Sequence, residues 1–122
     1  MSLSEFERSV PRRSARGRRP PIDHAHLARE SGGNNDRRNN ALRRFLLDAT
    51  DGVDRIKRAD SVETRAEAAR KLAAAAQSIG AFSVAYIASE IELAKGPVTG
   101  RLLALDRSVG EVRAEIAELL GQ

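Results

Sequence analysis

The chain has 122 residues, contains no cysteine and carries a formal net charge of +4 at pH 7. This length supports one domain with a single core, and the lack of cysteine excludes disulfides and thiolate metal sites. No apolar run approaches the roughly 20 residues that span a bilayer, and the N-terminus lacks the apolar core of a signal peptide. We therefore expect a cytoplasmic protein without a membrane segment.

The positive charge is concentrated in the first 20 residues, where six arginines stand against two glutamates. The rest of the chain holds equal numbers of basic and acidic side chains. The segment is rich in proline, glycine and serine and has no apolar period, so burial cannot offset the entropy cost of ordering it. We expect residues 1–20 to form a disordered basic tail. Arginine runs attract nucleic acid or anionic lipid, but no aromatic residues alternate with these arginines, which disfavours specific nucleic-acid binding.

From residue 21 onward the apolar residues repeat at helical spacing, and no segment alternates as a strand does. Three Phe and one Tyr are few for a sheet, so the predicted fold class is all-α. The first element is a short helix with Asp23 as N-cap and Leu27 as apolar anchor, ending at the Ser-Gly-Gly of residues 31–33. We expect it to cover the domain as a lid.

Two longer helices follow. Residues 36–58 form the first, weakened slightly by Gly52, and its inward positions recur every three or four residues. The next helix opens at Asp60, which forms a capping-box pattern with Glu63, and ends at Gly80. The inward positions of the two helices are Leu42, Phe45, Leu46, Ala49, Val53 and Ile56, then Val62, Ala69, Leu72, Ala76 and Ile79.

The last two helices are separated by Gly96-Pro97, a pair that suits a helix stop and a new start. Residues 81–94 form the first of them. Four long helices with short links must pack largely antiparallel to their sequence neighbours. We predict an antiparallel up-and-down four-helix bundle with a short extra N-terminal helix. The inward positions here are Phe82, Val84, Ala85, Ala88 and Ile91, then Val98, Leu102, Leu105, Val109, Val112, Ile116 and Leu119.

The region from Ala68 to Glu92 resembles the histidine phosphotransfer (HPt) domain. In that family the phosphate-bearing helix reads His-x-Leu-Lys-Gly and continues with small residues, a Gly-Ala pair and a helix that closes on acidic residues. In this chain Leu72 occupies the leucine, Gly80-Ala81 matches the turn, and Glu90 or Glu92 matches the acidic close. The resemblance implies a component of a two-component phosphorelay whose partner is a response-regulator receiver domain or a hybrid histidine kinase.

The likeness extends to Pro21-Ile22-Asp23 and Phe45-Leu46, so it covers residues 21–122, but it fails at the functional motif. The family's histidine falls on Arg70, its lysine on Ala73 and its glycine on Ala74. A neutral imidazole nitrogen can attack an acyl phosphate, whereas a guanidinium stays protonated and has no lone pair to offer. We therefore expect neither phosphotransfer nor other enzymatic activity.

Receiver domains carry an acidic pocket around their phosphorylated aspartate, and the resemblance implies such a partner. We hypothesise that Arg70 enters this pocket and docks the receiver without transferring phosphate. The predicted docking face comprises residues that share one side of the helix. The alternative is an ordinary solvated surface on which Glu67 and Lys71 form an i,i+4 pair. The docking residues are Glu67, Arg70, Ala73, Ala74 and Gln77.

Two other functional readings involve the N-terminal part of the chain. His24 and His26, the only histidines, diverge by about 200° on a helix and have no third ligand nearby, so we expect no metal or cofactor site. The competing function is a helical structural or nucleic-acid-associated protein that acts through the basic tail. The oligomeric state stays open, because the regular last helix can complete the core or form an interface.

Overall fold

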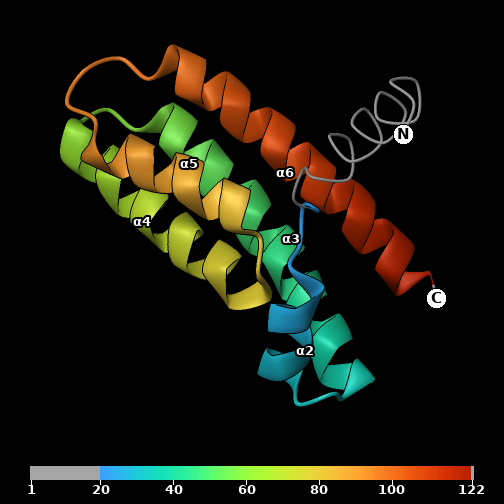
Figure 1. Cartoon of the computed structure of the whole chain (residues 1–122). Coiled ribbons are helices and arrows are strands. Elements are labelled where there is room, and N and C mark those ends of the chain that lie inside the picture. The colour runs from blue at the N-terminus through green and yellow to red at the C-terminus, as the bar shows by residue number, and fades with distance from the viewer. Residues whose placement is uncertain (1–19, 122) are drawn as a thin grey trace, which may run out of the picture.

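The computed structural model describes residues 20–121, and within that range it contains five helices and no strand. The all-α prediction is confirmed, and the helices form a bundle (Figure 1). Except for Pro20, the predicted disordered tail lies outside the described residues. None of the five helices is long and apolar enough to cross a membrane. They are α2 (His24–Ser31), α3 (Asn35–Arg58), α4 (Val62–Ile79), α5 (Phe82–Leu93) and α6 (Thr99–Leu120).

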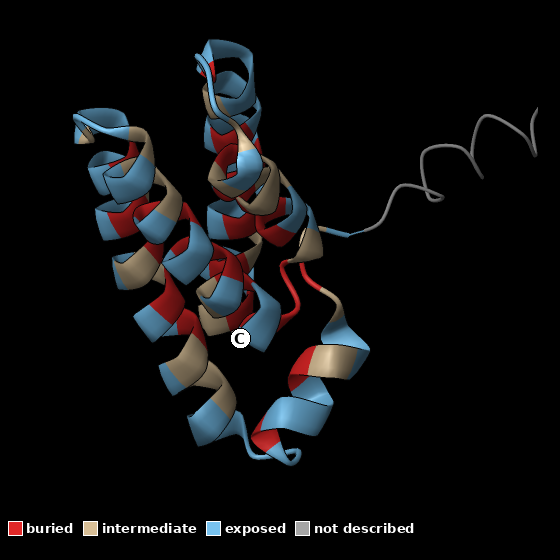
Figure 2. Ribbon diagram, turned by 90° about the vertical axis from the view of Figure 1, so that its left-hand side faces the viewer, coloured by how far each residue is buried: buried red, intermediate tan, exposed pale blue. Residues whose placement is uncertain are grey.

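Helix α4 lies between α3 and α5, and α6 packs against both α3 and α5. Apolar residues from every helix meet in one core, which lies where the ribbons of Figure 2 face one another. Burial of this apolar surface is the main favourable contribution to folding. The largest fully buried side chains are Phe45, Ile22, Leu42, Leu72, Ile79, Ile91, Leu105 and Ile116.

The helix ends follow the local sequence closely. Asp23 caps α2 by accepting a hydrogen bond from the His26 N–H at 3.0 Å, as predicted. The predicted N-cap of α4, Asp60, is wrong, because Ser61 has the extended backbone of an N-cap and its hydroxyl accepts from the Thr64 N–H at 3.0 Å. Serine and aspartate are similarly good N-caps, so residue type alone could not decide whether Asp60 or Ser61 caps α4.

Ile22 and helix α2 contribute side chains to the hydrophobic core, in addition to covering part of it. Ile22 is fully buried and Leu27 nearly so, and α2 packs against α3 and α4. The Asp23 N–H donates to the Gly80 carbonyl at 2.9 Å, directly after α4 ends. Gly80 has a φ of +82°, and a Cβ placed there would lie 2.9 Å from the Asp23 carbonyl oxygen. Glycine at this turn therefore meets both a backbone and a space requirement.

We expect Gly80→Ala to lower the free energy of unfolding more than Gly32→Ala does. Both glycines have left-handed φ values, but nothing lies within 4 Å of a Cβ at Gly32. The Gly32 variant should lose about 1 kcal/mol from backbone strain, and the Gly80 variant about 1–3 kcal/mol more from the clash. Urea unfolding followed by circular dichroism measures both. Equal losses would show that the Asp23 contact adds no steric requirement.

Candidate functional site

The outer side of α4 carries four of the five predicted docking residues. Glu67, Arg70, Ala74 and Gln77 are all exposed and recur at spacings of three and four, which places them on one helical face. We refer to these four residues as the α4 face. Opposite them, Leu72, Ala69 and Ala76 turn into the core. The local pattern of α4 therefore dictates which side chains can meet a partner.

Ala73, the fifth predicted docking residue, does not belong to this face, because it is buried with 7% of its surface exposed. At about 100° per residue, position 73 is rotated by about 60° from Arg70 toward the side of Ala69 and Ala76. Ala74 is rotated the other way and stays exposed. A spacing of three residues was therefore too coarse to separate an outward alanine from an inward one. Ala73 is corrected from the docking face to the core.

The charges on the α4 face are only partly compensated. Glu67 and Lys71 form the predicted i,i+4 ion pair at 3.7 Å, with both side chains largely exposed, so solvent screening leaves it worth a few tenths of a kcal/mol. Arg70 forms no ion pair with any of the described residues 20–121. Its guanidinium can therefore donate hydrogen bonds to an incoming carboxylate without first losing an internal partner.

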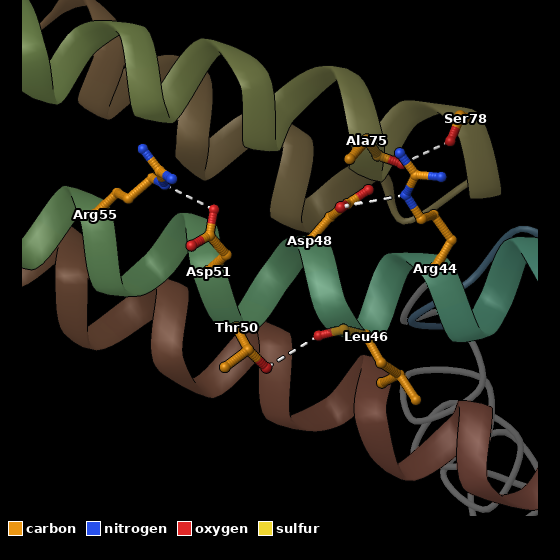
Figure 3. Close-up of polar contacts among 8 residues, drawn as sticks. All are labelled: Arg44, Leu46, Asp48, Thr50, Asp51, Arg55, Ala75 and Ser78. Atoms are coloured by element: carbon orange, nitrogen blue, oxygen red, sulfur yellow. Dashed lines mark hydrogen bonds and ion pairs between the residues drawn. The ribbon is translucent and has the colours of Figure 1, made fainter.

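A groove of about 910 Å³ lies beside the α4 face, between α3 and α4. Its carboxylates are largely paired with cations one turn away on the same helix (Figure 3): Asp51 Oδ2 lies 2.7 Å from Arg55 Nε, and Asp48 Oδ1 lies 3.5 Å from Arg44 Nε. Within residues 20–121, no group of three or more His, Cys, Asp or Glu side chains is placed to hold a metal ion. The groove is thus a mixed-charge surface.

The two histidines lie away from the α4 face and diverge, as their spacing predicted. His24 Nε2 contacts Glu115 Oε2 on α6, and Glu115 Oε1 also accepts from the Ile22 N–H at 2.9 Å. The His26 ring packs edge-on against Phe82 on α5, with ring centroids 5.1 Å apart. Both contacts hold α2 to the bundle. Sequence reasoning missed Glu115, since no local spacing rule connects residues more than 90 positions apart.

Comparison of the chain with protein-family models, with curated proteins and with solved structures found no match in any of the three.

Neighbouring alanines provide a direct check of the α4 face. We expect Ala73→Gln to lower the free energy of unfolding by about 2 kcal/mol or more, because a longer polar side chain must enter a packed core. Ala74→Gln should change it by no more than about 0.5 kcal/mol, because residue 74 is exposed. Thermal or urea unfolding of the two variants measures this difference. Similar losses in both would contradict the assignment of Ala73 to the core.

Proposed function

We propose that the chain is a degenerate HPt-type protein of a two-component phosphorelay, which docks receiver domains and carries no phosphate. In this proposal α3 to α6 form an antiparallel up-and-down four-helix bundle, with α2 as the extra helix. The observation that carries the proposal is the exposure of Arg70 and its lack of an ion pair within residues 20–121. In the resemblance, Arg70 occupies the position of the family's histidine.

The chemistry of Arg70 supports docking rather than transfer. A guanidinium presents five N–H donors in a planar fork that matches a carboxylate in two parallel hydrogen bonds. It cannot form a phosphoramidate in the way that a neutral imidazole does, because it keeps its proton. The carboxylates of a receiver's acidic pocket can therefore accept hydrogen bonds from Arg70, but Arg70 cannot attack the receiver's phosphoryl group.

The neighbours of Arg70 favour close approach. Ala74, one turn further along α4, is exposed and small, so a partner can reach the helix surface beside the guanidinium. Gln77 adds an amide that can donate and accept. Complementary charge across such a surface mainly raises the association rate and selects the partner, while contacts at close range set the dissociation rate. The α4 face thus supports recognition of an acidic partner.

The proposal includes a partner and a compartment. The partner is a response-regulator receiver domain, either free or as part of a hybrid histidine kinase, and the protein acts in the cytoplasm where such domains are phosphorylated. Binding would hold a receiver or compete with an active phosphotransfer protein for it. No enzymatic step, metal or cofactor is required, since docking alone changes the population of free receiver.

We expect a panel of receiver domains to contain at least one that binds the wild-type chain and binds Arg70→Glu at least tenfold more weakly. The reversal puts a carboxylate against the partner's carboxylates, and like charges at an interface are strongly unfavourable. Arg107→Glu on α6 is the matched control, because Arg107 is exposed and the change in net charge is identical. Isotope-labelled chain followed by backbone amide shifts in NMR gives the affinities and the location of binding.

Three outcomes separate the candidate functions. Saturable shifts centred on Arg70, Ala74 and Gln77 would support docking. Transfer of an acid-labile radiolabel from a phosphorylated receiver to the chain would contradict the absence of phosphotransfer. Loss of binding on deletion of residues 1–20, with Arg70→Glu still binding, would favour the alternative in which the basic tail acts on nucleic acid or another anionic partner.

A further inference from the structure

Helix α5 has one side that the other described residues leave open to solvent. Tyr86 is 66% exposed and Leu93 is 75% exposed. Ser83 and Glu90 share this side of the helix, because the four residues recur at spacings of three and four. We refer to Ser83, Tyr86, Glu90 and Leu93 as the α5 face. Since α5 contains no basic residue, this face combines apolar surface with negative charge.

The first described residue of the chain lies at the beginning of the α5 face. Pro20 lines a cavity of about 490 Å³ together with Phe82 and Ser83. The hydrogen bond from the Asp23 N–H to the Gly80 carbonyl, 2.9 Å long, holds this part of the chain to the turn that precedes α5. The residues before Pro20 therefore leave the bundle next to Ser83.

We propose that the arginine-rich segment directly before Pro20 binds the α5 face of the same molecule. Residues 16–19 contain three arginines and no acidic residue. One guanidinium stacks on the Tyr86 ring, and another pairs with the Glu90 carboxylate. The aliphatic part of an arginine side chain covers Leu93. This inference goes beyond the proposed function, because it involves neither the α4 face nor a receiver domain.

The length of the segment matches the length of the α5 face. Ten residues separate Ser83 from Leu93, and at a rise of 1.5 Å per residue they extend over about 15 Å of helix. An extended chain covers about 3.3–3.6 Å per residue, so about five residues span this distance. Residues 15–19 are therefore sufficient. The contact uses side chains only and requires no regular structure in the segment, which fits its composition.

The covalent connection makes weak contacts sufficient. Each exposed ion pair or stacked guanidinium contributes little alone, because solvent screens it. A short flexible link gives the segment an effective concentration on the order of millimolar at the α5 face. Binding within one molecule is therefore favoured over the same contacts between molecules at micromolar concentration. A nucleic acid that binds these arginines must first displace them from α5.

Other surfaces of the bundle suit an arginine segment less well. In the groove between α3 and α4, three aspartates already pair with arginines one turn away on the same helix. Leu103 on α6 is also exposed, but Arg107 follows it by one turn and repels further cations. Glu90, by contrast, forms no ion pair with any of residues 20–121. The α5 face alone combines exposed apolar side chains with an uncompensated carboxylate beside Pro20.

A spin label on the segment tests the contact. The chain has no cysteine, so Ser14→Cys provides a single attachment site for a nitroxide in the full-length protein. If residues 15–19 cover the α5 face from Ser83 onward, position 14 lies near Leu93. At low salt we expect the label to broaden the amide signal of Leu93 more strongly than that of Ser83. A segment that does not bind would give the reverse order, because Ser83 is nearer to the point of exit.

Two charge reversals provide the comparison. Glu90→Lys should reduce the broadening at Leu93 several-fold, and added salt should do the same. Glu111→Lys on α6 is the matched control, because Glu111 is exposed and the change in net charge is identical. It should leave the broadening unchanged. Unfolding curves confirm that the variants remain folded.

Three results would overturn the inference. The first is broadening that is strongest at Ser83 and insensitive to Glu90→Lys. The second is broadening centred on the groove between α3 and α4, which would assign the segment to the aspartates there. The third is broadening that depends on mixing spin-labelled chain with isotope-labelled chain, which would make the occupant a second copy. The sample contains no receiver domain, so failure here leaves the proposed function standing, and failure of the receiver panel leaves this inference standing.

Discussion

The close packing of α4 between α3 and α5 is the constraint on which the rest of the structure depends. Its inward positions are mostly alanine, with Ala69 and Ala76 fully buried, so the neighbouring backbones can approach where larger side chains would hold them apart. On the α3 side the approach is matched by Gly52, where an added Cβ would lie 3.4 Å from the Leu72 side chain. Once α4 is held on two sides, only one face of it remains for a partner.

That constraint also shapes the chemistry of the exposed face. Because the core side of α4 is already used by its neighbours, Glu67, Arg70, Ala74 and Gln77 are kept at fixed angles and heights by a rigid helix. A site on a packed helix loses less conformational entropy on binding than a site on a loop. Only the side chains of Glu67, Arg70 and Gln77 must be ordered. A face held in this way can therefore present a recognition surface with little reorganisation of the backbone.

Periodicity and capping residues were sufficient for the helices but insufficient for several details. The apolar spacing correctly placed five helices and most inward residues, because each helix must bury one side. The apolar spacing did not identify Ala73 as buried, because alanine occurs on both the buried and the exposed sides of helices. Helix propensity predicts that Gly52 weakens α3, whereas in the structure its lack of a side chain leaves room for Leu72. Contacts between distant segments, such as Ile22 with Glu115, depend on the assembled fold and leave no mark in local spacing.

The contact between Ile22 and Glu115 joins nearly the two ends of the described chain, whereas the helices of the bundle are linked by short connections and can pair as each one forms. Contacts far apart in sequence are slow to form, because closing a long loop costs entropy before any contact repays it. During synthesis Ile22 emerges well before its partner Glu115 on α6, which lies 93 positions later in the chain. Helix α2 is thus made before α6 and is held by Glu115 only after α6 has formed.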